Sequence, residues 1–302
     1  MSINLWGWRE DGRGAVRLGL SEGVSAEVLD LATAGIASAE ALYDIWQEKG
    51  HAGIRDLLTR YPERRPLHEP DLVFPVPVSE IWGAGVTYER SRDAREEESE
   101  GFDALYRLVY DAPRPEIFFK HPGRRMAQPN EVMGLRDDAR WHVPEPELSV
   151  VLGPAGEIFG YTGGNDLSAR DIEGQNPLYL PQAKMFHKSA SLGPSIALAD
   201  SIDPAALIIT CTITRGSDVV FSGRTTTSLI RRPLGELVRA LRHAWPLEPW
   251  TVLMTGTGIV SPDDVALVDQ DVITISVTGI GILTNPVRTI TGAWMDASGP
   301  DR

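Results

Sequence analysis

The stretch "RWHVPEPELSVVLG", residues 140–153, places two glutamates on either side of a proline, directly before an apolar run. In a strand, residues two apart face the same side, with Cα atoms roughly 6.5 to 7 Å apart. Glu145 and Glu147 should therefore point together, while Pro146 faces the other way and donates nothing to the ladder. Carboxylates this close repel each other, so one should stay protonated unless a cation joins them. The stretch predicts a buried strand with a cation site at its start.

A third oxygen ligand has a candidate further along the chain. The segment "GYTGGNDLSARD", residues 160–171, is expected to turn at Gly163–Gly164 and to present Asp166 at the end of a short strand. Carboxylate oxygens suit hard dications, so we favour Mg²⁺ over zinc, with Mn²⁺ or Ca²⁺ as substitutes. The alternative is an ordinary salt-bridged or solvated pair of glutamates beside a simple turn.

The charge of such a site makes a further prediction. Three carboxylates and one dication leave a net charge of about −1, so an anionic substrate requires additional positive groups. The candidates are Lys120 in "PEIFFK" and Lys184 and Lys188 in "PQAKMFHKS". Any one lysine is more often a surface residue, but the charge balance predicts at least one beside the carboxylates.

Composition excludes several classes of function. The chain has 302 residues, 29 of them basic and 42 acidic, with a formal net charge of −13. This charge disfavours nucleic acid and anionic membranes as partners. The start has no signal-peptide pattern, and no apolar run reaches the roughly 18 residues of a spanning helix. The single cysteine, Cys211, lies in a β-like run and is interpreted as a small buried hydrophobe rather than a nucleophile. We expect a cytoplasmic protein.

The first part of the chain differs from the rest. Residues 25–50 show apolar residues at helical spacing and end in glycine, which predicts a helix. The proline-rich residues 61–82 are typical of an extended crossing segment. We therefore expect a small N-terminal α/β domain over residues 1–72 and a catalytic domain over residues 73–302.

The rest of the chain is dominated by strand patterns. Short apolar or alternating runs bounded by Gly, Pro, Asn and Asp predict strands within residues 80–88, 115–120, 147–153, 158–167, 206–224, 250–260 and 271–287. The Gly-Ser pair within 214–223 predicts a hairpin tip. Helical patterns are restricted to residues 92–111 and 231–245. Strands without regular intervening helices favour a mixed, rolled sheet, that is, an α+β fold that is mainly β.

Six motifs occur in a fixed order: "EPELSVVLG" (145–153), "GYTGGNDLSARD" (160–171), a lysine nine residues before the glycine of "LGPSI", "FSGRTTTSLI" (221–230), "TGTGIV" (255–260) and "GIGILTNPV" (279–287). Together they resemble the fumarylacetoacetate hydrolase family over roughly residues 80–290. The resemblance implies a mixed β-roll core, a variable N-terminal domain, a Mg²⁺ ion and a homodimer. It also implies that Glu145, Glu147 and Asp166 bind the metal, that Lys184 lies beside the substrate, and that Thr257 binds the substrate carboxylate.

One segment departs from the family pattern. Hydrolases of the family commonly carry a histidine shortly after a tyrosine near the start of the core, as the base that activates water. In this chain Tyr88 is followed by Glu89, Arg90 and Ser91. The stretches "TYERSR", "RPEIFFK" and "NPLYLPQAK" resemble instead a branch of 2-keto-3-deoxy-sugar-acid dehydratases.

This branch implies a dehydration of a 2-keto acid. The metal holds the carboxylate and keto oxygens, a C3 proton is removed, and the C4 hydroxyl leaves as water. A pentonate such as 2-keto-3-deoxy-D-arabinonate would give 2-oxoglutarate semialdehyde. We expect Lys184 to be the base and Glu116 the acid, because burial shifts the pKa of either group toward neutrality. The expected substrate contacts are Tyr88, Arg90, Ser91, Lys120, Gln182 and Thr257.

Three alternatives stay open. The first is hydrolysis of a C–C bond in an acylpyruvate or another diketo acid, with Glu116 or His187 as the base that activates water. The second is decarboxylation or tautomerisation of oxaloacetate, which needs the metal and little else. The third is a non-catalytic relative that binds a keto acid. The carboxylate triad disfavours this last alternative, because buried like charges without a task would only destabilise the fold.

Overall fold

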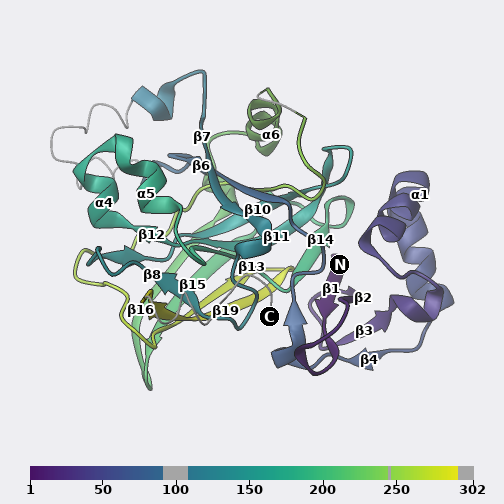
Figure 1. Cartoon of the computed structure of the whole chain (residues 1–302). Helices are drawn as coiled ribbons and strands as arrows, with labels where there is room; N and C mark the ends of the chain where they lie inside the picture. Colours follow the sequence, from purple (N-terminus) through teal and green to yellow (C-terminus); the bar gives the residue numbers. More distant parts are fainter. Residues whose placement is uncertain (91–107, 244–245, 292–302) are drawn as a thin grey trace.

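The computed structural model describes residues 1–90, 108–243 and 246–291, and the described strands form two main sheets (Figure 1). The larger sheet has the order β4 (Arg65–Pro66), β3 (Glu27–Asp30), β2 (Arg17–Glu22), β1 (Ile3–Trp8), β14 (Ser195–Leu198), β11 (Ile158–Asp166), β10 (Pro146–Leu152), β17 (Val252–Met254), β6 (Glu80–Gly85), β7 (Glu116–Pro122). Two short strands join it off this path, β13 (Ala190–Leu192) on β11 and β5 (Leu72–Val73) on β1.

The smaller sheet has the order β16 (Asp218–Thr226), β15 (Ile208–Arg215), β18 (Val272–Val277), β19 (Gly281–Thr289), β8 (Met133–Leu135). A separate ladder joins β9 (His142–Val143) to β12 (Ser168–Ala169). The α-helices that lie wholly within the described residues are α1 (Ala39–Arg60), α4 (Arg170–Gln175), α5 (Leu180–Lys184) and α6 (Leu234–Arg242). Parallel pairs β17–β6 and β19–β8 among antiparallel neighbours make both sheets mixed. The mainly β, α+β fold expected from the sequence is confirmed.

The main core lies where β10 and β11 face β15 and β18. Every residue of β10 is buried, as its continuous apolar run predicts, whereas β15 and β18 alternate between buried and half-buried positions. Cys211 lies in this core, and burial raises the pKa of its thiol to about 12. Its interpretation as a small buried hydrophobe is confirmed.

Residues 1–72 join the rest of the chain through a shared sheet and a shared core. Strand β1 pairs with β14, with Asn4 opposite Ala197. A second apolar cluster includes Leu5 and Leu42 from this segment together with Ile196 and Trp250. The domain boundary at residue 72 stays a prediction. Among the described residues, no helix combines the length and the hydropathy that crossing a membrane requires.

The helix expected over residues 25–50 is wrong in its first half. Residues 27–30 form β3, which pairs with β2 and buries three of its four residues. The helix begins only after Ser38, whose hydroxyl accepts a hydrogen bond from the Ala41 N–H at 3.2 Å. Gly50, at φ 58° and ψ −157°, is a kink rather than an end, and α1 continues to Arg60. Pairing with β2 decided the conformation of a segment whose spacing alone favoured a helix.

The turn expected at Gly163–Gly164 is also wrong, because both glycines lie inside β11. Gly164 pairs with Glu147, and a Cβ atom on it would lie 2.4 Å from the hydroxyl of Ser149. A Cβ on Gly163 would come within 3.1 Å of Val277 in the facing sheet. These glycines permit close packing of the strand on its neighbours. Asp166 does end the strand, as expected.

Two other local predictions fall on described residues and are confirmed. Strands β15 and β16 form the hairpin, in which Arg215 pairs with Asp218 and Gly216 takes φ +60° at the tip. Helix α6 follows Pro233 and buries Leu237, Val238 and Leu241. The helix predicted over residues 92–111 lies mostly outside the described residues.

The burial of His142 in β9 leads to a testable prediction about the stability of the protein in acid. The backbone N–H of Arg136 donates to His142 Nε2 at 2.9 Å, and burial lowers the pKa of the ring to about 4. The unfolded chain therefore binds a proton more readily, and stability falls as the pH drops from about 6.5 towards 4. Glutamine can accept the same N–H without titrating. Between pH 7 and pH 5, we expect the unfolding free energy of His142→Gln to fall by about 2 kcal/mol less than that of the wild type.

Urea unfolding of both proteins at the two pH values measures this difference. His68→Gln is the matched control, because the side chain of His68 is 74% exposed. An identical pH dependence for wild type and His142→Gln would contradict the prediction.

Candidate active site

Glu145, Glu147 and Asp166 meet where β10 begins and its antiparallel neighbour β11 ends. Pro146 pairs with Asn165 in the last pair of the ladder, so their chain neighbours Glu145, Glu147 and Asp166 come together at that end of the two strands. One oxygen atom of each carboxylate lies within 4.8 Å of the others, and all three residues are at most 5% exposed. The expectation that the two glutamates point the same way and that Asp166 joins them is confirmed by this geometry.

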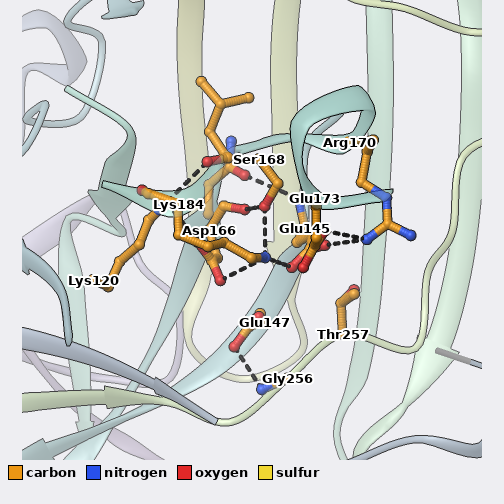
Figure 2. A network of polar contacts seen from close by, with 12 residues as sticks. Lys120, Glu145, Glu147, Asp166, Ser168, Arg170, Glu173, Lys184, Gly256 and Thr257 are labelled. Atoms are coloured by element: carbon orange, nitrogen blue, oxygen red, sulfur yellow. Dashed lines mark hydrogen bonds and ion pairs between the residues drawn. The ribbon is translucent and has the colours of Figure 1, made fainter. Parts of the chain in front are cut away.

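Lys184, the last residue of α5, lies between two of these carboxylates (Figure 2). Its Nζ is 2.5 Å from Glu145 Oε2 and 3.1 Å from Asp166 Oδ2, and it donates to the hydroxyl of Ser168 at 2.6 Å. The side chain is fully buried. A buried ammonium group in contact with the carboxylates is what the charge balance of the sequence predicts.

Lys120 in β7 is a second buried cation at the site. Its Nζ forms an ion pair with Asp166 Oδ1 at 2.6 Å and donates to the carbonyl oxygens of Leu167 at 2.8 Å and Lys184 at 2.6 Å. Burial lowers the pKa of its ammonium group, although Asp166 opposes the shift. These contacts tie β7 to the segments that carry Asp166 and Lys184. Lys188, the third lysine considered, pairs instead with Glu131 at 3.1 Å.

Glu147 is the carboxylate with the most unfavourable surroundings. Burial, and then the charges of Asp166 and Glu145, raise its pKa well above the usual value of 4.5. Its Oε2 accepts a hydrogen bond from the Gly256 N–H at 2.6 Å. Gly256 has φ +90°, and a Cβ there would lie 2.0 Å from the hydroxyl of Thr87, so this donor position requires glycine. The repulsion predicted from the Glu-Pro-Glu pattern is thus present in the fold.

Asp166 lies beside cations rather than beside anions, so its pKa shifts in the opposite direction to that of Glu147. Burial tends to raise the pKa of its carboxyl, but Lys120 and Lys184 outweigh this and lower it overall. Asp166 is therefore ionised, while Glu147 tends to keep a proton in the absence of a further cation.

Arg170 and Glu173 complete the buried charge cluster, and of the two it is Glu173 that sequence reasoning missed. The Arg170 guanidinium lies 3.3 Å from Glu145 Oε1 and 2.7 Å from Glu173 Oε2. Both residues lie in α4, three positions apart, which is a spacing that brings an arginine and a glutamate together on a helix. That spacing in "ARDIEG" was the available signal.

The donor set fits a hard dication. Counted at full ionisation, the cluster has four carboxylates and three cations, a net charge of −1; its members are Glu145, Glu147, Asp166, Glu173, Lys120, Lys184 and Arg170. A dication would change this to +1, which a monoanionic ligand would balance. Carboxylate oxygens, with no histidine or cysteine in the group, are the ligands that Mg²⁺ prefers.

The predicted substrate contacts take varied positions. Tyr88 is 1% exposed, and its ring faces Gly258, where an added Cβ would lie 2.5 Å away. Burial, and then the charge of Glu147, raise the pKa of the Tyr88 phenol. Tyr88 and the exposed Arg90 line a cleft of about 880 Å³. Ser91 lies outside the described residues.

The remaining predicted residues lie on other elements. Glu116 is half-buried at the start of β7, opposite Gly85, where an added Cβ would lie 2.0 Å from its Oε2. Thr257 donates its hydroxyl to the Pro146 carbonyl at 2.9 Å, beside the candidate metal ligands Glu145 and Glu147. Gln182 is an exposed residue of α5. The roles of all these residues stay predictions.

Comparison with known proteins identifies the class to which this fold and site belong. The fumarylacetoacetate (FAA) hydrolase C-terminal profile matches residues 80–288, and the chain belongs to this family. It is 45% identical over 217 residues to a probable 2-keto-3-deoxyxylonate dehydratase of Haloferax volcanii, covering 72% of this chain and 74% of that protein. It is 42% identical over 218 residues to 2-dehydro-3-deoxy-D-arabinonate dehydratase of Saccharolobus solfataricus, covering 71% and 73%.

A solved structure extends the likeness to nearly the whole chain. It is a 2-keto-3-deoxy-D-arabinonate dehydratase complexed with magnesium and 2,5-dioxopentanoate, with a TM-score of 0.77 and 32% sequence identity. The match covers 95% of this chain and 99% of that one. The family and the dehydratase branch to which the sequence motifs pointed are confirmed.

Proposed function

We propose that this protein is a Mg²⁺-dependent dehydratase of a 2-keto-3-deoxy sugar acid. The preferred substrate is a pentonate such as 2-keto-3-deoxy-D-arabinonate, which would give 2-oxoglutarate semialdehyde, that is, 2,5-dioxopentanoate. The observation that carries the proposal is the buried carboxylate triad with Lys184 in contact with it. Two relatives named dehydratases support it, as does the solved structure of a dehydratase complexed with magnesium.

Glu145, Glu147 and Asp166 would hold the metal. When bound, Mg²⁺ supplies a Lewis acid that polarises the keto group and makes the C3 protons more acidic. The Gly256 N–H fixes Glu147, and Lys120 fixes Asp166, so two of the three ligands are oriented by contacts already present.

Lys184 would take up the C3 proton as a neutral amine, the form that burial and a nearby dication favour. Its Nζ already lies within hydrogen-bond distance of two metal ligands, so a substrate chelated there is within its reach. Its three polar partners leave the ammonium group little freedom to rotate away. Lys120 is the positioning residue behind it, because its Nζ binds the Lys184 carbonyl.

Glu116 would protonate the departing C4 hydroxyl, so that the C4–O bond breaks and water leaves. The unsaturated product then isomerises to the semialdehyde without another reagent. Tyr88, Arg90, Ser91, Gln182 and Thr257 would hold the rest of the substrate. Among these residues, Tyr88 is the best-supported substrate contact, because its buried hydroxyl has no hydrogen-bond partner among the described residues. A cytoplasmic location and a homodimer stay predictions.

A substrate panel tests the proposal. Purified protein is incubated with 2-keto-3-deoxypentonates, 2-keto-3-deoxyhexonates, acylpyruvates and oxaloacetate, with Mg²⁺ and after EDTA, and products are identified by NMR and mass spectrometry. We expect a deoxypentonate to lose one water in a single product, and EDTA to abolish the reaction. Two fragments from an acylpyruvate, with no dehydration, would identify a hydrolase instead.

A further inference from the structure

Glu145 differs from the other two candidate ligands in how it is held. It precedes β10, outside the regular ladder, whereas Glu147 lies within β10 and Asp166 within β11. Its backbone N–H donates to the Asn165 side chain at 3.2 Å and its carbonyl accepts from the Asp166 N–H at 3.0 Å, but these contacts hold only the backbone and not the carboxylate. The orientation of that carboxylate therefore depends on the side chains around it.

Two cationic side chains contact the Glu145 carboxylate, one at each oxygen atom (Figure 2). Oε2 lies 2.5 Å from Lys184 Nζ, and Oε1 lies 3.3 Å from the Arg170 guanidinium. Arg170 is 5% exposed and begins α4, directly after the short strand β12. Its backbone N–H is also fixed, by the Trp141 carbonyl at 2.7 Å.

Glu173 pairs with the same guanidinium and so weakens the electrostatic attraction between Arg170 and Glu145. Glu173 is 4% exposed, and its Oε2 is closer to the guanidinium, at 2.7 Å, than Glu145 is. A guanidinium paired only with Glu145 would neutralise it and compete with a dication. Sharing the charge with Glu173 keeps the guanidinium in place and leaves Glu145 negative.

We propose that Arg170, held by Glu173, is a positioning residue that fixes the Glu145 carboxylate for metal binding. The inference rests on the proposed Mg²⁺ site and assigns to Arg170 and Glu173 a role that acts through Glu145. A single guanidinium nitrogen, Nη1 of Arg170, makes both contacts, and its two N–H bonds lie at a fixed angle in the guanidinium plane, which a freely rotating lysine ammonium does not reproduce.

Arg170→Lys tests the proposal at constant charge. We expect Mn²⁺, measured by titration calorimetry on the purified protein, to bind about 10- to 100-fold more weakly. Saturating metal should restore most of kcat, because the reacting groups are unchanged. Arg215→Lys is the matched control: Arg215 pairs with the buried Asp271 at 2.8 and 2.9 Å within the smaller sheet. It should lower the melting temperature and leave Mn²⁺ affinity unchanged.

Glu173→Gln is the second variant, in case Arg170→Lys fails to fold. It keeps an acceptor for Arg170 but turns the whole guanidinium charge toward Glu145, so Mn²⁺ affinity should again fall. Wild-type affinity in a folded variant would overturn the proposal and leave only a structural role. If wild-type protein binds neither Mg²⁺ nor Mn²⁺, the proposed function fails together with this inference, whereas binding and dehydration by wild type with unchanged variants overturn this inference alone.

Discussion

Replacing Glu147 by glutamine is expected to make the metal-free protein more stable and the enzyme inactive. Glutamine has the same shape and can still accept the Gly256 N–H at the position where Oε2 now lies 2.6 Å away. It removes the carboxyl group whose ionisation is disfavoured by burial and then by the charges of Asp166 and Glu145. The unfolding free energy in EDTA should rise by about 1 to 3 kcal/mol near pH 8. Turnover should fall by about 10³-fold, because one of the three proposed metal ligands is lost.

The sign of the pH dependence follows from the direction of the pKa shift. The folded protein holds the Glu147 proton more tightly than the unfolded chain does, so stability falls as the pH rises above about 4.5. The gain from Glu147→Gln should therefore grow with pH and vanish in acid. Urea unfolding at several pH values in EDTA measures it, with Glu131→Gln, an exposed partner of Lys188, as the control. A variant less stable than wild type at pH 8 would contradict the prediction.

The candidate ligands could be predicted because their placement depends on local rules. Glu145 and Glu147 are two residues apart at the start of a strand, and that spacing directs their side chains to one side. Asp166 ends the next strand, which pairs with the first in a simple antiparallel ladder. Only the side-chain period and one pairing were needed to bring the three together.

The counter-charges could be anticipated in number but not in arrangement. The net charge of the site required a lysine, but charge alone did not distinguish Lys184, which contacts two candidate ligands, from Lys188, which pairs with Glu131. Only the family resemblance singled out Lys184. Lys120 lies in a strand 46 residues before Asp166, and no spacing in the sequence predicts that the two side chains form an ion pair. Contacts between elements distant in sequence are decided by tertiary packing.

The two errors in local structure have the same origin. The Gly163–Gly164 pair is a turn signal when read alone, but here the missing Cβ atoms allow Ser149 and Val277 to approach. The Val28–Leu29 stretch fits a helical pattern, but pairing with β2 makes it a buried strand. In both places long-range packing overrides the local preference.

Lys184→Met is expected to separate the fold from the chemistry. The substitution leaves Glu145 and Asp166 without the ammonium that now lies 2.5 and 3.1 Å from them. In EDTA the unfolding free energy should fall by about 3 to 5 kcal/mol, the effect of removing one partner of a buried ion pair. Saturating Mg²⁺ should restore most of this stability by binding the folded state alone.

Activity should not return with the stability. Without Lys184 the C3 proton has no acceptor at the chelated carbon, so turnover should stay about 10²- to 10⁴-fold below wild type at saturating Mg²⁺. Exchange of the C3 protons in deuterated water, followed by NMR, should slow by a similar factor. Lys188→Met removes a lysine that pairs with Glu131 and should leave exchange unchanged. If the metal-loaded Lys184→Met protein exchanges at the wild-type rate, proton removal belongs to another residue, and Lys184 serves only to balance the charge of the carboxylates.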